Sequence, residues 1–217
     1  SILVLMSHQL FDKNLKTAIQ PALAIEVFHN FTLIHDDIMD KAPLRRGQAT
    51  VHEKWDKNIA ILSGDTMLIH SYQLISTLSP NVLSEIIDVF NQAAINVCEG
   101  QRLDIDFETR NQISISDYLH MIEQKTAVLF AAALKIGGIT SKRNNIDQNH
   151  LYEFGRNLGI AFQLKDDLLD AFGSFESFGK KVGGDILANK KTYLYLKALE
   201  IANTKQQTEL FNYYSSN

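Results

Sequence analysis

Two short acidic clusters contain the residues whose type and spacing point most clearly to chemistry. The first is Asp36-Asp37-Ile38-Met39-Asp40, and the second repeats its spacing as Asp166-Asp167-Leu168-Leu169-Asp170. On an α-helix, offsets of zero, one and four residues place three side chains at about 0°, 100° and 40° around the axis. Each cluster therefore presents three carboxylates on one helix face.

Three like charges on one face repel one another, so a cation would stabilise each cluster. Carboxylate oxygens are the ligands that Mg²⁺ prefers. The alternative is a solvated acidic face, the usual fate of a charge run. With 15 Asp in 217 residues, chance alone would place this triple roughly 0.07 times, yet it occurs twice, each time directly after an apolar helical pattern. The sequence therefore predicts metal binding at both clusters.

Basic pairs accompany both clusters. Arg45-Arg46 follows the first, while Lys180-Lys181 and Lys190-Lys191 follow the second. Any one pair taken alone is best interpreted as surface charge. However, Mg²⁺ usually also holds a substrate phosphate or diphosphate, and guanidinium groups bind phosphate oxygens in a bidentate manner. Together, the acidic and basic groups predict a diphosphate clamp.

Long helices are expected to position these groups. Residues 101–136 and 185–217 contain neither Gly nor Pro, which favours helices. Apolar spacing predicts a helix that Pro21 opens and that runs through Ile34, and another from about His150 to Leu169. Ser116-Asp117 is the predicted N-cap of a further helix. Connections are expected at 41–47, 79–81, 137–149 and 173–184.

Composition limits the classes of function. The 21 Lys+Arg and 25 Asp+Glu give a net charge of −4, whereas a general nucleic-acid binder needs a basic surface. A single cysteine, Cys98, excludes an intrachain disulfide and fits a reducing, cytosolic setting. No apolar stretch approaches the ~18 residues that cross a bilayer. The few Gly and Pro, 11 and 3, favour helices over a β-sandwich or barrel.

The stretches around the clusters resemble a known family. Leu33 to Asp40, followed by Arg45-Arg46-Gly47, resembles the first aspartate-rich motif of the trans-isoprenyl diphosphate synthases, members of the polyprenyl synthetase family. Gly159 to Asp170, then Gly183-Gly184-Asp185 and Asn189-Lys190-Lys191-Thr192, is similar to their second motif and its lysine tail. Glu99-Gly100-Gln101 and Lys125-Thr126 match further landmarks in the right order. The resemblance covers nearly the whole chain.

The resemblance implies an all-α fold, a bundle of long antiparallel helices around a deep central cavity known as the isoprenoid synthase fold. It implies a single domain over residues 1–217 that lacks its N-terminal and C-terminal ends. The implied activity is that of a Mg-dependent trans-prenyltransferase joining an allylic diphosphate to isopentenyl diphosphate, head to tail. More than one Mg²⁺ would bridge to the substrate diphosphate. The implied assembly is a homodimer, and we expect a cytoplasmic location.

The resemblance also assigns roles to single residues. The metal ligands would be Asp36, Asp40 and Asp166, with Asp37, Asp167 and Asp170 completing or orienting the two sites. The groups that grip the allylic diphosphate would be Arg45, Lys125, Lys181 and Lys190. The residues facing isopentenyl diphosphate would be Arg46 and His29. Those near the developing cation would be Gln163 and Thr126.

Several of these supporting residues have simpler interpretations. His29 on an apolar helix is equally well a core histidine. Thr126 is also well placed to bond its own helix backbone. Gln101 and Asp104, three residues apart, either support the metal ligands or form an exposed pair. These alternatives stay open on the sequence alone.

The chemistry makes defined demands on such a site. Diphosphate leaves an allylic carbon as a cation forms, so metal ions and basic groups must stabilise the departing charge. A dry apolar cavity must then keep water from the cation. The released diphosphate can accept the final proton, so no nucleophilic Ser or Cys and no side-chain base is required.

Phe31 is the candidate that limits product length. It lies five residues before Asp36 and is expected to line the cavity below the metals. In the family, a bulky residue here limits the growing chain, whereas the neighbouring Thr32 leaves more room than a second aromatic. A product of fifteen or twenty carbons is expected. An ordinary core Phe is the alternative.

The family's upstream Gly-Lys-Arg type motif is absent, and the chain stops before the family's last helices. Trimmed ends explain this better than a defective paralogue, because both aspartate motifs are intact. A class I terpene cyclase is the nearest rival, but its second metal motif normally mixes Asn or Asp with Ser/Thr and Glu. A non-catalytic partner subunit usually loses one cluster. A helical cation binder without chemistry would not need the basic pairs.

Overall fold

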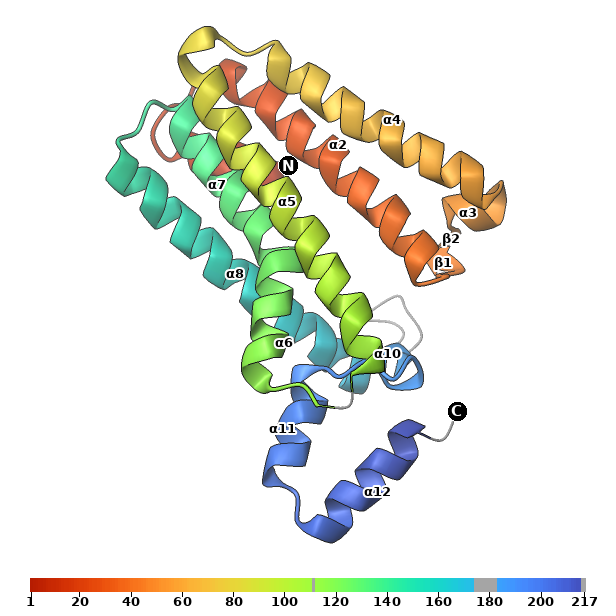
Figure 1. Ribbon diagram of the computed structural model, residues 1–217. Coiled ribbons are helices and arrows are strands. Elements are labelled where there is room, and N and C mark those ends of the chain that lie inside the picture. Colours follow the sequence, from red (N-terminus) through yellow and green to blue (C-terminus); the bar gives the residue numbers. More distant parts are fainter. Residues whose placement is uncertain (111, 174–182, 216–217) are drawn as a thin grey trace. The chain divides into compact units, whose positions relative to one another are not determined.

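The computed structural model describes residues 1–110, 112–173 and 183–215 (Figure 1). Its regular structure is almost entirely helical, and the one described sheet is a hairpin of two short strands. The expected all-α class is therefore confirmed. Contacts divide the chain into two compact units, Ser1–Ile95 with Val128–Asn157, and Asn96–Ala127 with Leu158–Asn217. Among the described residues, no helix is long and apolar enough to cross a membrane.

The first unit is built on helix pairs. Its elements are α1 (Ile2–Gln9), α2 (Lys16–Met39), β1 (Leu44–Arg45), β2 (Gln48–Ala49), α3 (Val51–Lys54), α4 (Lys57–Ser76), the start of α5 (Pro80–Thr109), α7 (Val128–Thr140) and the start of α8 (Asn145–Phe172). Helix α2 packs along α4, and α1 packs on α7 (Figure 1). The first acidic cluster lies at the C-terminal end of α2.

Aromatic rings form the centre of the first unit. The ring centroids of Phe28 and Phe90 are 5.1 Å apart in an edge-to-face arrangement, and Tyr72 meets Phe90 in the same way at 5.2 Å. Ile75 and Ile86 are fully buried beside them. Such aromatic pairs add to the free energy of burial, so this core fixes α2 against α4 and α5.

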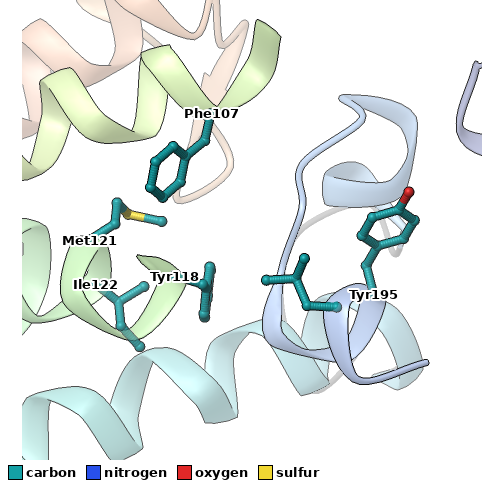
Figure 2. Packing of buried hydrophobic residues seen from close by; sticks show 6 residues of the cluster. Phe107, Tyr118, Met121, Ile122 and Tyr195 are labelled. Carbon is teal, nitrogen blue, oxygen red and sulfur yellow. The ribbon is translucent and has the colours of Figure 1, made fainter. Parts of the chain in front are cut away.

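The second unit contains the second acidic cluster. Its elements are the end of α5, α6 (Ile115–Ile122), a π-helical turn η1 (Glu123–Ala127), the end of α8, α10 (Gly184–Leu187), α11 (Tyr193–Ile201) and α12 (Thr204–Ser215). The buried cluster of this unit contains Phe107 of α5, Met121 and Tyr118 of α6, and Tyr195 of α11 (Figure 2). This packing holds the C-terminal half of α8 through the side chains that it contacts.

Several predicted boundaries are wrong. Pro21 lies inside α2, which begins at Lys16, so one helical backbone hydrogen bond is lost there. Helix α8 begins at Asn145, because Asn144 Oδ1 accepts from the backbone of Asp147 at 2.9 Å. The N-cap of α6 is Ser114, which forms a capping box with Asp117. The hairpin at 44–49 extends past the expected connection at 41–47, α5 already begins at Pro80, and α7 and α8 take up both ends of the expected connection at 137–149.

Candidate active site

The first aspartate triple lies where a helix tolerates negative charge least. Asp36 and Asp37 are in the last turn of α2, Asp40 is the C-cap residue, and that turn contains no basic residue. A helix C-terminus carries partial negative charge, so carboxylates there are unfavourable without a cation. Asp37 is 4% exposed. The local sequence therefore creates a demand for positive charge at this end of α2.

Arg45 supplies part of that charge from the hairpin. Arg46 and Gly47 have φ angles of 53° and 74°, which suit the tight two-residue turn of a hairpin, and Arg45 pairs with Gln48 across it. Arg45 Nε donates to Oδ1 and Oδ2 of Asp37 at 2.8 and 2.9 Å, and its Nη2 donates to Asp36 Oδ2 at 3.2 Å. Burial acts to lower the pKa of Arg45, but Asp37 outweighs it and the pKa is raised. The guanidinium stays charged.

His29 and Arg46 lie in the same electrostatic neighbourhood. His29 is half-buried on α2, and burial lowers its pKa; Glu26 opposes this effect, while the charges of Arg46 and Arg45 reinforce it. His29 and Asp36 are seven residues apart, which is nearly two full turns and places them on one face of α2. The charges of Arg45 and Arg46 thus reach His29, and the role of His29 and Arg46 toward isopentenyl diphosphate stays a prediction.

Phe31 and Thr32 point to different sides of α2. The Phe31 ring lies 5.5 Å from Phe28 and 4.7 Å from His35 between centroids. It faces Gly64 of α4, where an added Cβ would be 3.5 Å from its Cδ2. Thr32 donates its hydroxyl to the His29 carbonyl at 2.8 Å. The Phe31 ring thus lies on the α4 side of α2, about 140° around the helix from Asp36, and its role in limiting product length stays a prediction.

The second triple ends α8 in the same way. Asp167 is 4% and Asp170 7% exposed, whereas Asp166 is half-buried. Asp170 Oδ2 accepts the backbone N–H of Asp185 at 2.9 Å. Burial raises the pKa of Asp167, and burial together with Asp170 raises the pKa of Asp185 to about 6. The charge of Lys190 acts against both pKa shifts. This predicted lysine is therefore close enough to the cluster to act on its carboxylates.

The two triples share one feature that their sequence does not reveal. In both, the middle carboxylate is the most buried and is held by a neighbouring side chain of its own unit. Arg45 holds Asp37. For Asp167, Tyr118 Oη donates to Oδ2, and Gln163 Nε2 donates to Oδ1 at 3.1 Å. The middle position therefore orients each cluster, while the first position, Asp36 or Asp166, is only half-buried.

The predicted pair Lys125 and Thr126 lies in the π-helical turn, a distortion frequent at functional sites. Gly100 of α5 and Gly159 of α8 allow this turn to be approached closely: an added Cβ would come within 2.2 Å of Lys125 N and 2.5 Å of Ala127 Cα. Lys125 Nζ binds Asp104 Oδ2 at 2.6 Å. The backbones of α5 and α8 thus contact the turn directly, with no side chain between them, and this contact fixes its position.

Thr126 does not bond its own helix in the manner of Thr32. Its hydroxyl donates to Gln163 Oε1 of α8 at 3.0 Å. Asp104 pairs with Lys125, so it is not simply half of an exposed pair with Gln101. Only the fold shows that these residues contact one another.

The basic residues after the second cluster have different roles. Lys191 Nζ donates to the carbonyls of Phe107 and Glu108 at 2.9 and 3.3 Å, which caps the end of α5. Lys181 lies outside the described residues. Sequence reasoning did not single out Tyr118, and no local signal could have done so, because its partner Asp167 is 49 residues away along the chain.

The donor set fits a hard divalent cation. Among the residues that the structure describes, no three His, Cys, Asp or Glu side chains converge to hold an ion by themselves. Mg²⁺ is commonly bound by one or two carboxylates together with substrate phosphate oxygens and water. The accessible carboxylates and nearby cations of each unit suit that mode of binding.

Comparisons with known proteins give a consistent result. The family model for polyprenyl synthetase matches residues 1–217. A geranylgeranyl diphosphate synthase of Methanosarcina mazei is 41% identical over 199 residues, which are 91% of this chain and 61% of that protein. The chain thus spans about three-fifths to two-thirds of the length of the first curated relatives it matches.

Solved structures agree. A crystal structure of a geranylgeranyl pyrophosphate synthase shares 51% identity and superposes with a TM-score of 0.94, covering 99% of this chain and 65% of that one. A geranyltransferase from Helicobacter pylori, complexed with magnesium and isoprenyl diphosphate, shares 30% identity with a TM-score of 0.81, covering 97% and 74%.

Proposed function

The chain belongs to the polyprenyl synthetase family, and on this basis we propose that the protein is a trans-prenyltransferase. It condenses an allylic diphosphate with isopentenyl diphosphate, head to tail, to give a longer all-trans prenyl diphosphate and diphosphate. The observation that carries the proposal is the pair of aspartate triples, each ending a long helix with its middle carboxylate buried and held by a neighbour.

Each reactant has candidate binding groups. Asp36, Asp40 and Asp166 would hold Mg²⁺ ions, more than one of them, together with the allylic diphosphate. Such ions supply positive charge that stabilises diphosphate as it departs. The cations that grip the same group are Arg45, Lys125, Lys181 and Lys190. Arg46 and His29 bind isopentenyl diphosphate, where a neutral imidazole can donate one hydrogen bond without adding charge.

The reaction balances without a side-chain base. The bond between allylic carbon and diphosphate oxygen breaks, and a new carbon–carbon bond forms to isopentenyl diphosphate. The proton lost from the resulting cation goes to the released diphosphate. Thr126 and Gln163 place neutral oxygen and amide groups near the cation, where they stabilise positive charge without reacting with it.

We propose a twenty-carbon product. Several similar proteins are named as geranylgeranyl diphosphate synthases, and the geranylgeranyl group has twenty carbons. Two others, 42% and 36% identical to this chain, are named as geranylfarnesyl diphosphate synthases. Thr32 beside Phe31 leaves room for a chain longer than fifteen carbons. The names of these relatives give no support to a terpene cyclase or to a non-catalytic subunit.

Product analysis tests the proposal directly. The full-length protein is incubated with Mg²⁺ and each of dimethylallyl, geranyl and farnesyl diphosphate, with and without isopentenyl diphosphate. Elongated prenyl diphosphate that depends on isopentenyl diphosphate and disappears with EDTA is the expected result. A hydrocarbon formed without isopentenyl diphosphate would instead indicate a cyclase, and turnover only after a second chain is added would indicate a partner subunit.

We also propose that the enzyme is a cytoplasmic homodimer. Helix α4 buries one face, with Ala60, Gly64 and Ser71, but the opposite face is apolar and open: Ile59, Leu62 and Ile69 are 44%, 62% and 61% exposed. An exposed apolar stripe of this kind favours a second copy of the chain. Leu62→Glu is expected to halve the mass measured by light scattering; an unchanged mass would place the dimer contact elsewhere.

A further inference from the structure

A continuous chain of hydrogen bonds runs through the second unit. Thr126 Oγ1 donates to Gln163 Oε1 at 3.0 Å, and Gln163 Nε2 donates to Asp167 Oδ1 at 3.1 Å. Tyr118 Oη donates to the other oxygen, Asp167 Oδ2. Three elements contribute to the chain, namely α6, the π-helical turn and α8.

The chain has only one consistent direction. An ionised carboxylate can accept hydrogen bonds but cannot donate them, so the amide nitrogen of Gln163 must face Asp167. The amide oxygen then faces Thr126, and the Thr126 hydroxyl must donate its proton to that oxygen. Consequently the lone pairs of Thr126 Oγ1 remain available on the side away from Gln163.

Burial makes this arrangement rigid. Tyr118 is 3% exposed and packs with Met121 and Ile122 of its own helix and with Phe107 of α5 (Figure 2). Its ring therefore cannot swing its hydroxyl away from Asp167 without opening the cluster. Hydrogen bonds in such a chain also strengthen one another in a medium of low dielectric.

We propose that Tyr118 is a positioning residue for the reaction centre. By anchoring Asp167 it fixes the orientation of the Gln163 amide, and through Gln163 it makes Thr126 turn its oxygen lone pairs toward the electron-poor allylic carbon. The role rests on the proposed function, since it needs a cation at that carbon. A neutral oxygen presented in this way stabilises positive charge as it develops.

Other hydroxyls of the protein show that this geometry is not automatic. Thr32 and Thr66 donate to carbonyls of their own helices, at His29 and Leu62, which is the usual arrangement for Thr within a helix. Tyr195 belongs to the same buried cluster as Tyr118, but its hydroxyl makes no hydrogen bond to any other residue that the structure describes. Tyr195 thus offers a matched control in the same core.

The test is Tyr118→Phe, which removes one oxygen and keeps the ring. Loss of a hydrogen bond that orients a reaction centre is expected to lower kcat about tenfold, with the KM of both diphosphates within about twofold, because no group that touches them is removed. Tyr195→Phe should leave kcat within about twofold of the wild type. Steady-state assays with farnesyl diphosphate, or whichever primer is elongated, supply the values.

Coupling between residues separates positioning from general damage. In a Thr126→Val background, Tyr118→Phe should change kcat less than about twofold, because the end of the chain is already missing. In a Thr126→Ser background, which keeps the hydroxyl, the tenfold loss should return. Gln163→Leu interrupts the chain without altering the buried cluster, so in that background too Tyr118→Phe should change kcat less than about twofold.

The outcomes are distinct. An equal loss from Tyr118→Phe in the Val and Ser backgrounds, or an unchanged kcat in the wild-type background, would overturn the inference while leaving the proposed function intact. A wild-type protein that elongates no primer would overturn the proposed function itself, and the positioning role with it.

Discussion

Replacing Gly100 by Ala should disturb the turn that contains Lys125 and Thr126. A Cβ at this position would lie 2.2 Å from Lys125 N, 2.5 Å from its Cα and 2.7 Å from the carbonyl carbon of Gln124. Ordinary van der Waals contact begins at 3.4 Å, so α5 and the π-helical turn must move apart by about 1.2 Å. All three contacted atoms belong to the backbone, so no side-chain rotation can relieve the overlap.

The expected effects on activity and stability differ in size. A displacement of about 1 Å at a reacting group can lower kcat by ~100-fold. Overpacking costs about 1–3 kcal/mol of the free energy of unfolding, and the better helix propensity of Ala returns about 1 kcal/mol of it. Gly100→Ala should therefore lose most of its activity while losing no more than about 2 kcal/mol of stability.

Gly138→Ala is the matched control within a helix. Its added Cβ would meet the flexible end of the Leu151 side chain at 2.8 Å, while Gln148 Cγ, at 3.4 Å, is already at ordinary contact distance. This variant should be as active as the wild type and as stable or more so, by up to about 1 kcal/mol. Elongation assays and urea unfolding measure both variants. If Gly100→Ala behaves like Gly138→Ala in both measurements, the close approach does not locate the turn.

Three further perturbations test other parts of the site. Arg45→Met leaves the buried Asp37 carboxylate without its guanidinium partner and should cost about 2–3 kcal/mol of unfolding free energy. The loss is smaller than for a fully buried pair because Arg45 is partly exposed. Urea unfolding without metal measures it, and a loss under ~0.5 kcal/mol would contradict the expectation. Phe31→Ala should lengthen the product in chromatographic analysis, whereas an unchanged product distribution would assign Phe31 to the core alone. Burial lowers the folded-state pKa of His29 below 6.5, so just below pH 6.5 the unfolded state binds more protons than the folded state. The free energy of unfolding should therefore fall as the pH falls through that window. His29→Asn should flatten this pH dependence, and an unchanged slope in urea unfolding would show that another group is responsible.

Much of the fold could be predicted because a helix leaves a pattern in its own stretch of sequence. The scarcity of Gly and Pro and the apolar spacing indicated an all-α chain, and the structure confirms it. Boundaries were less predictable, because capping depends on single side chains. Ser114 rather than Ser116 caps α6, and Pro21 is accommodated within α2, where the tertiary packing of a long helix outweighs one lost backbone hydrogen bond.

The same distinction applies to the candidate site: features within one helix could be predicted, but contacts between elements could not. Spacing along one helix determines which side chains share a face, so the sequence alone located both aspartate triples. The Lys125-Thr126 pair was singled out only by the family resemblance. The sequence did not reveal which carboxylates are held by protein groups. The hairpin turn at Arg46-Gly47 brings Arg45 back to Asp37, and nothing in the local sequence specifies that pairing.

By itself, then, the sequence determined that two helices end in triple carboxylates accompanied by cations, and hence the class of chemistry. Only the tertiary structure decided that Asp37 and Asp167 are buried and oriented by neighbours. Tyr118 and Asp167 are 49 residues apart, and Thr126 and Gln163 are 37 apart. Contacts across such separations depend on how closely backbones approach, as at Gly100 and Gly159, and this is set by packing rather than by helical periodicity.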